Sequence, residues 1–357
     1  MHAGQVPGRD LKRLGGLLGA AALIVAACGG GATTAPTSAP TGAASAAPTA
    51  TAEAKTLELA YISFAVANSY DAPMLAAAQA SAAAGNAKLT VFDGNLNPAT
   101  QTTQLQDAIA SGKFDGIVLQ PVFGPALVQG ALDAIAAGIA VGNIDQILGD
   151  DNTTADPQVE GLSANVVFVP SELGRKIGEL VVEACADSNP CNVGYIFSVK
   201  VAALDTTLRE AFDEAISVNP AIKVVAEGES FYTTALGLKA SQDMLAAHSD
   251  LTVITGADQA ITGAVQAVSD AGLKDQVRLV GYGGGAIAFQ GIASGERYGT
   301  VMQAPATEGR IGIQQLIEAI RTGTPAAGVD VLADLPDGGV VTADNVETFL
   351  PLAEWPG

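Results

Sequence analysis

Short apolar runs alternate with longer, alanine-rich stretches along most of the chain. The apolar runs occupy residues 57–66, 88–93, 115–121, 139–145, 162–169, 192–198, 222–228, 251–256 and 276–282. Longer stretches between them include residues 71–85, 98–113 and 124–138. Strands that are buried on both faces are typically continuous apolar runs. The alternation therefore predicts an α/β fold whose parallel sheets are covered by helices on both sides.

Glycines stand at the ends of several predicted helices. A helix often ends at a residue in the left-handed conformation, which glycine adopts without strain. The candidates are Gly85, Gly112, Gly138 and Gly272. We expect these residues to form C-caps.

The alternation breaks once, at residues 146–161, in a polar stretch that contains Pro157. We interpret this stretch as a loop between two α/β units. Its polar residues Asp150, Asp151, Asn152 and Asp156 lack the ordered spacing of a calcium-binding loop, so we expect a solvated loop and no metal site. Two such units joined end to end would place a ligand cleft at the carboxyl ends of their strands.

The first 27 residues have the features of a secretory signal peptide. Basic residues at positions 9, 12 and 13 precede an apolar segment, residues 14–27, that is too short to span a bilayer as a helix. The sequence Val-Ala-Ala-Cys at 25–28 resembles the lipobox of bacterial lipoproteins, which implies that Cys28 carries lipid. An ordinary signal peptide followed by a chance cysteine is the alternative. Residues 28–55 are nearly all Gly, Ala, Ser, Thr and Pro and predict a disordered tether.

The charge of the chain limits its partners. The formal net charge is −20, and the predicted leader contains three of the 17 basic residues but only one of the 37 acidic ones, so the rest is more acidic still. Nucleic-acid binding depends on Lys and Arg contacts to phosphates, and we therefore exclude it. Hydrophobic residues make up 48% of the chain, which is enough for sizeable cores.

Two cysteines, Cys185 and Cys191, lie between a helix-like and a strand-like segment. In an exported protein this spacing favours a disulfide that closes a short turn. Two free thiols or a metal site are the alternatives, although no nearby histidine or third cysteine supports a metal.

Polar and aromatic residues follow the predicted strands. Phe231 is one of them, and the eleven that we take as candidates for ligand binding are Phe64, Asn68, Tyr70, Asp71, Phe123, Asp145, Thr206, Tyr232, Asp258, Tyr282 and Gln303. Carboxylates and amides can bind hydroxyl groups, and aromatic rings can pack on the C–H faces of a small polyhydroxy ligand. Any one of these residues alone would more often be a helix cap or a packing residue, so their joint position around one cleft carries the prediction.

The body of the chain resembles the type I periplasmic binding proteins, the substrate receptors of ABC importers, and within them the ribose-binding branch. The resemblance covers about residues 56–345 and rests on NSYDAPM at 68–74, IAVGNID at 139–145, GADQAITGAVQAV at 256–268, VRLVGY at 277–282 and GTVMQAPATEGRIG at 299–312. It implies that Asn68, Tyr70, Asp145 and Gln303 contact a sugar.

The resemblance also implies two Rossmann-like lobes joined by a hinge that the chain crosses near Pro170, Ala304 and Leu332. The first lobe would comprise residues 56–169 plus 304–332, and the second residues 170–303 plus 333–357. It further implies ABC permease subunits as partners, an exported and lipid-anchored monomer, no cofactor and no catalysis.

Three positions of the second lobe depart from the family pattern. Thr206 stands where these sugar binders usually have arginine, Ala257 where they have asparagine, and Gly283 where they have aspartate. Three polar contacts to the ligand are thereby lost. Either the ligand is less polar, such as a nucleoside or another small cyclic metabolite, or other residues take over the contacts. The candidate substitutes are Asp205, Arg209 and Gln259.

Enzymatic and sensory functions are the competing hypotheses. GYGGGA at 281–286 matches a dinucleotide-binding pattern, but no acidic residue closes a following strand, so we favour a flexible cleft loop. The only histidines are His2 and His248, which makes histidine-dependent catalysis and histidine-based zinc sites improbable. Acid–base chemistry by Asp145 and Asp258 stays open, as does a receptor that presents its ligand to a membrane sensor.

Overall fold

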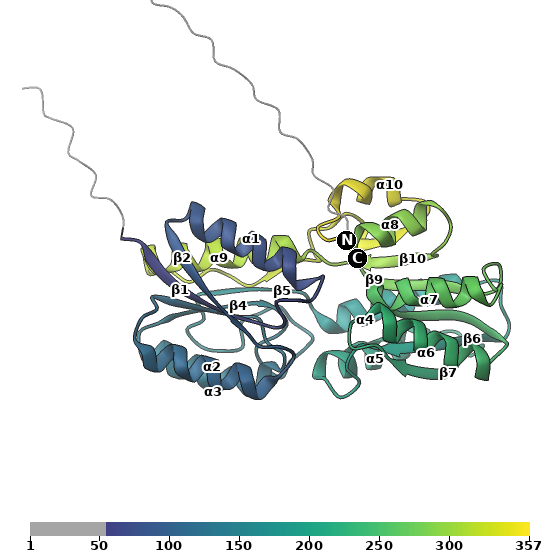
Figure 1. Ribbon diagram of the computed structural model, residues 1–357, viewed down its shortest axis with the longest axis horizontal. Helices are drawn as coiled ribbons and strands as arrows, with labels where there is room; N and C mark the ends of the chain where they lie inside the picture. The colour runs from purple at the N-terminus through teal and green to yellow at the C-terminus, as the bar shows by residue number, and fades with distance from the viewer. Residues whose placement is uncertain (1–54) are drawn as a thin grey trace, which may run out of the picture. The chain divides into compact units, whose positions relative to one another are not determined.

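The computed structural model describes residues 55–357, in which strands and helices alternate around two separate sheets (Figure 1). The predicted signal peptide at 1–27, the predicted lipidation site Cys28 and nearly all of the predicted tether lie outside the described residues. None of the described helices has the length and hydrophobicity needed to cross a membrane.

The first sheet has six strands, all parallel. In spatial order they are β11 (Val329–Asp330), β5 (Ala164–Val167), β4 (Ala140–Asp145), β3 (Gly116–Leu119), β1 (Leu57–Ser63) and β2 (Ala87–Asp93). Helices α1 (Asp71–Ala84) and α9 (Pro305–Thr322) cover one face, and α2 (Pro98–Ser111) and α3 (Gly124–Ala136) cover the other (Figure 1).

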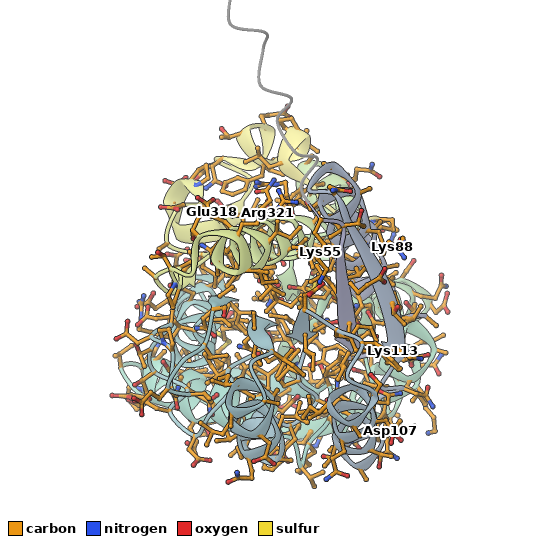
Figure 2. All side chains as sticks on the ribbon, turned by 90° about the vertical axis from the view of Figure 1, so that its left-hand side faces the viewer. Lys55, Lys88, Asp107, Lys113, Glu318 and Arg321 are labelled. Atoms are coloured by element: carbon orange, nitrogen blue, oxygen red, sulfur yellow. A yellow bond between two sulfur atoms is a disulfide. The ribbon has the colours of Figure 1, made fainter. Side chains whose placement is uncertain are left out.

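Side chains of β1 alternate between these two faces. Tyr61 belongs to the core that contains Met74 of α1, whereas Ile62 belongs to the core that contains Leu105 of α2 and Leu127 of α3. A strand that is buried on both faces must be apolar throughout, which is why the run was recognisable in the sequence. The outer surfaces carry charged side chains that point away from these cores, among them Asp107, Glu318 and Arg321 (Figure 2).

The second sheet has the same strand order in its main part, with one antiparallel edge strand. In spatial order its strands are β12 (Val340–Thr342), β10 (Gly299–Met302), β9 (Arg278–Gly283), β8 (Leu251–Ala257), β6 (Cys191–Phe197) and β7 (Ile222–Glu229). The helices that follow or precede them are α4 (Pro170–Ala184), α5 (Ala203–Ile216), α6 (Thr234–Ala247), α7 (Asp258–Asp270), α8 (Ala286–Ala293) and α10 (Val346–Phe349). Helices α4 and α5 pack together, as do α6 and α7.

The chain passes between the two sheets three times, from β5 to α4, from β10 to α9 and from β11 to β12. Pro170, Ala304 and Leu332 lie in or beside these three connections. The α/β fold with two lobes is thus confirmed. The lobe boundaries given above stay a proposal.

Two details differ from the sequence predictions. The polar loop at 146–161 connects β4 and β5 of the same sheet, so it does not separate the two units. Gly112 caps α2 in the left-handed conformation, as predicted, but Gly85 has a φ of −83° and the following Asn86 takes the positive φ instead. Asparagine is one of the few other residues that tolerate this conformation.

Cys185 and Cys191 form the predicted disulfide, with their Cα atoms 5.8 Å apart. Cys185 caps α4 and Cys191 begins β6, so the bond closes the short turn between a helix and a strand.

Candidate functional site

A cavity lies at the carboxyl ends of strands from both sheets. Its lining comprises Phe64, Asn68, Tyr70, Asp71, Asp145, Gln146, Phe168, Leu204, Tyr232, Ala257, Gln259, Tyr282, Gly283, Gln303 and Trp355. Eight of the eleven residues predicted to bind a ligand are in this set. The structure thus brings together residues that are far apart in the sequence, because the carboxyl ends of parallel strands meet at one edge of each sheet.

The loop after β1 supplies four lining residues. Asn68 accepts a hydrogen bond from the backbone N–H of Tyr70 through its side-chain oxygen (2.8 Å), and its own carbonyl accepts one from the N–H of Ala72. These bonds form a tight turn that leads directly into α1, whose first residue is Asp71. Such local side-chain-to-backbone bonds are typical of asparagine and fix the direction of the neighbouring side chains.

A buried amide, Gln120, holds the two carboxyl groups of the cavity. It directly follows β3, and its Nε2 donates hydrogen bonds to Asp71 Oδ1 and to Asp145 Oδ2 (3.2 Å). Its Oε1 accepts from the hydroxyl of Tyr61 and from the backbone N–H of Phe64, both at 3.1 Å. Gln120 was not among the predicted residues, although its position as a polar residue near the end of an otherwise apolar run was a signal for it.

The pKa values of the carboxyl groups in and near the cavity are raised. Burial raises the pKa of Asp145 to about 7, against the opposing effect of the Gln120 hydrogen bond. Burial and the charge of Asp145 raise the pKa of Asp71 well above its ordinary value. Glu308, on the first turn of α9, is fully buried and its pKa is likewise raised, by burial and then by Asp145. Three acids therefore share one poorly solvated region.

Asp145 also has an unusual backbone conformation, with a φ of 70°. A non-glycine residue in this region carries conformational strain, and such strain concentrates at functional sites. Aspartate and asparagine tolerate it better than other residues. This conformation occurs at the end of β4, where Asp145 and Gln146 both line the cavity.

Aromatic side chains form most of the apolar wall. Phe64 meets Tyr232 edge to face with ring centroids 6.1 Å apart, and Tyr70 meets Trp355 in the same way at 5.6 Å. The hydroxyl of Tyr282 lies 2.9 Å from Ser198 Oγ. Burial raises the pKa values of Tyr70, Tyr232 and Tyr282, so these phenols stay neutral.

Trp355 lies beside Gly283, the position where aspartate was expected from the family pattern. A side chain on Gly283 would come within 2.7 Å of the Trp355 ring, and Trp355 Nε1 donates a hydrogen bond to the Gly283 carbonyl (2.9 Å). Gly283 also has a φ of 129°, a conformation that favours glycine. Trp355 was not among the predicted residues, because only the tertiary fold returns the C-terminal segment to this site.

Three predicted ligand-binding residues lie elsewhere. Phe123 caps the start of α3 and is 39% exposed, outside the cavity lining. Thr206 is on α5, and its hydroxyl donates to the carbonyl of Ala202 (3.1 Å). Asp258 is fully buried, and its carboxylate is occupied by Arg297 (3.1 Å), by the hydroxyl of Thr300 and by the N–H of Gly284. Because both of its carboxylate oxygens already have partners, Asp258 has a structural role.

Of the three suggested substitutes, only Gln259 lines the cavity. Asp205 accepts a hydrogen bond from the N–H of Ser198 and lies beneath the surface. Arg209 forms ion pairs with Asp213 and Glu227 on the outer side of α5. Three further lining residues, Gln146, Phe168 and Leu204, were not predicted, and two of the positions that depart from the family pattern, Ala257 and Gly283, also line the cavity.

A family model described as a periplasmic binding protein domain matches residues 59–325. The chain belongs to this family. It is 29% identical over 241 residues to the D-ribose/D-allose-binding protein of Pseudomonas aeruginosa. The match covers 66% of this chain and 72% of that protein.

Solved structures of periplasmic and other solute-binding proteins have the same fold. The myo-inositol binding protein of Caulobacter, bound to myo-inositol, superposes with a TM-score of 0.71 at 22% identity, over 82% of this chain and 96% of that one. A solute binding protein of an ABC transporter from Mycobacterium smegmatis, with bound glycerol, superposes with a TM-score of 0.71 at 24% identity, over 85% of this chain and 100% of that one.

In this periplasmic binding protein the glycine-rich segment at 281–286 is covered by the C-terminal residues of the same chain. The N–H groups of Ala286 and Ile287, at the start of α8, donate to the carbonyls of Trp355 and Pro356 (both 2.9 Å). A side chain on Gly285 would meet the backbone of Gly357. The C-terminal segment thus fills the space over these glycines that a dinucleotide phosphate would need. The segment is packed rather than the flexible loop expected from the sequence.

The acidic loop at 150–156 is organised by its own hydrogen bonds. Asp151 accepts from the N–H (2.9 Å) and hydroxyl (2.6 Å) of Thr153, which lowers the pKa of Asp151. Among residues 55–357, no group of three or more His, Cys, Asp or Glu side chains is arranged to hold a metal ion.

Proposed function

We propose that this periplasmic binding protein is the extracytoplasmic receptor of an ABC importer, that it binds a sugar or sugar-like molecule in the cavity between its two lobes, and that it delivers this ligand to the permease. The observation that carries the proposal is the cavity itself. It combines two carboxyl groups, four side-chain amides and six aromatic rings at the strand ends of both sheets.

This set of groups matches the chemistry of a polyhydroxylated ring. Asp71 and Asp145 can accept hydrogen bonds from hydroxyl groups, and the amides of Asn68 and Gln303 can donate and accept. The rings offer flat apolar surfaces to the C–H faces of the ligand. The lining residues include no Ser, Cys, His or Lys, so the cavity lacks a nucleophile paired with a base, and we propose binding without chemical conversion.

Closure of the two lobes on the ligand would follow from the connections. Three chain segments link the lobes, and residues of both line the cavity. Hinge motion in such two-lobed proteins closes the cleft around the ligand, and the closed form differs in shape from the open one. We propose that the permease recognises the closed form, and that lipid on Cys28 and the tether at 28–55 keep a monomeric receptor beside the membrane.

A nucleoside or other small cyclic metabolite is the second candidate ligand. The observation that favours it is the apolar part of the cavity wall formed by Leu204, Ala257, Gly283 and Trp355, since Ala257 and Gly283 stand where polar residues were expected. A base could stack between the aromatic rings there.

Thermal unfolding of the purified chain against pentoses, hexoses, cyclitols, nucleosides and amino acids tests the proposal. A ligand at 100 times its Kd adds about 2.7 kcal/mol of stability. This corresponds to a rise in Tm of roughly 5–10 °C for a chain of this size. A shift with sugars or cyclitols and no turnover supports the proposal. A shift confined to nucleosides transfers support to the second candidate, and a shift with neither class overturns both.

A further inference from the structure

The side chains that line the cavity supply negative charge and no positive charge. Asp71 and Asp145 are the carboxyl groups, and no Lys, Arg or His is among the lining residues. The buried Arg297 is paired with Asp258 and donates to Thr262, so its charge is already balanced within the protein. Arg209 is likewise paired on the surface.

The two cavity carboxyl groups are short of hydrogen-bond donors. One oxygen of each accepts from the same nitrogen, Gln120 Nε2, and the other oxygen of each has no hydrogen-bond donor among the described residues. A neutral amide that is divided between two acids compensates little of the cost of burying them.

A third buried acid interacts electrostatically with Asp71 and Asp145. Glu308 is 0% exposed, and neither of its carboxyl oxygens has a hydrogen-bond partner. Burial, and then nearby charges that include Asp145 and Asp71, raise its pKa well above the ordinary value, and its charge is in turn among those that raise the pKa of Tyr70. The hydroxyl of Tyr70, itself a lining residue, is also buried without a partner. Buried polar groups without partners destabilise a protein unless something supplies the missing interaction.

The aromatic wall favours the same kind of ligand. Phe64, Tyr70, Tyr232, Tyr282 and Trp355 surround the cavity together with Phe168. The face of an aromatic ring attracts a cation, and the attraction grows when the site is desolvated. Carboxyl groups and several aromatic rings that line one cavity can together recognise an ammonium group.

We infer that the ligand of this cavity is a polyhydroxylated ring that carries a protonated amine, an amino sugar or an aminocyclitol, and that the ammonium group lies between Asp71 and Asp145. The inference rests on the proposed function and narrows its ligand class. The ammonium group provides the donors that Asp71 and Asp145 lack, and its positive charge favours their ionised form. The ring hydroxyls are bound by the amides of Asn68, Gln259 and Gln303.

Matched pairs of ligands test the inference by isothermal titration calorimetry on the purified chain at pH 7. The pairs are glucosamine with glucose, galactosamine with galactose, and an inosamine with the corresponding inositol. Each pair differs by one amine in place of one hydroxyl. N-acetylglucosamine retains the nitrogen without the charge. We expect at least one amine to bind roughly tenfold to hundredfold more tightly than its neutral partner, because charge-assisted bonds to buried carboxylates are strong.

Two substitutions locate the ammonium group. Asp145→Asn and Asp71→Asn keep the shape of the side chain and remove its charge, and each should abolish most of the preference for the amine over its neutral partner. Asp243→Asn, which removes an exposed carboxylate of α6 paired with Lys239, is the matched control and should leave the preference unchanged.

The outcomes separate this inference from the proposed function. Amine-selective binding that both cavity substitutions erase supports the inference. Neutral sugars that bind as tightly as their amines overturn it and leave the sugar receptor intact, as does a preference that survives both substitutions. If neither member of any pair binds, the sugar-like ligand is itself wrong and the inference falls with it.

Discussion

The two halves of the cavity use the same topology for different purposes. The sheets have the same order in their main parts, so that β3 and β8 hold corresponding positions. Gln120 directly follows β3, and Asp258 directly follows β8. In the first lobe the neutral Gln120 holds two acids toward the cavity, whereas in the second lobe the acid itself is held by Arg297 and turned into the core.

The difference shows what separates a binding carboxylate from a structural one. Asp145 ends β4 and Asp258 directly follows β8; both are buried, and burial raises the pKa of each. Only Asp258 has a buried cation and several backbone and hydroxyl donors to offset that cost. An acid that is fully satisfied by its own protein has nothing left to offer a ligand. An acid that is not satisfied is available to bind one.

The largest effect is expected from breaking the second-lobe ion pair. Arg297→Met leaves Asp258 buried without its cation and should lower the free energy of unfolding by about 3–5 kcal/mol. Urea denaturation measures the loss. Arg310→Met is the control, since Arg310 is exposed and its contact is a weak 3.5 Å bond to Gln314, and it should change stability little. Near-normal stability of the Arg297 variant would mean that the pair is dispensable.

In the first lobe we expect a substitution, Asp145→Asn, to raise the stability of the folded chain by an intermediate amount. The pKa of Asp145 is about 7 in the folded chain and lower in the unfolded chain. Between about pH 4 and pH 7 the folded state therefore binds more protons at this site, so the stability of the ligand-free protein falls as the pH rises through this window. Asp145→Asn should flatten that fall and raise the stability at pH 8 by an amount on the order of 2 kcal/mol.

Thermal unfolding of both proteins from pH 4 to pH 8 checks this expectation. Asparagine tolerates the positive φ of position 145, so the substitution should not strain the backbone. Equal pH dependence in the two proteins, or a loss of stability in the variant at pH 8, would contradict the view that this acid is unsatisfied without ligand. Asp243→Asn should follow the parent protein throughout.

The smallest effect is expected where the second-lobe wall meets the C-terminal segment. Trp355→Phe keeps a ring beside Tyr70 but removes the hydrogen bond from Nε1 to the Gly283 carbonyl. The loss of one such bond should cost about 1 kcal/mol. Urea denaturation gives the cost, and titration with the best ligand of the panel shows whether the wall keeps its shape. A large loss of affinity would show that Trp355 positions the ligand through its N–H group.

The polar edge of the cavity was partly visible in the sequence. Asn68, Asp71 and Asp145 follow apolar runs, and a residue in that position must lie near the carboxyl edge of a sheet. The same rule also selected Asp258 and Phe123, which lie outside the lining. Position after a strand determines the edge of the sheet but not the direction of the side chain or the presence of a buried partner such as Arg297.

The sequence by itself determined the strand and helix alternation, the two-lobed α/β architecture, the disulfide and the neighbourhood of the site. The alternation and the neighbourhood of the site follow from local periodicity and from the rule that parallel strands share one edge. The division into lobes followed from the family resemblance, and the disulfide from the spacing of two cysteines. Only the tertiary structure decided how the charges are balanced. It placed Gln120 between two acids, paired Asp258 with Arg297 and returned Trp355 to the wall beside Gly283. Pairings of this kind join residues that are 25 to 72 positions apart, and no local pattern in the chain records them.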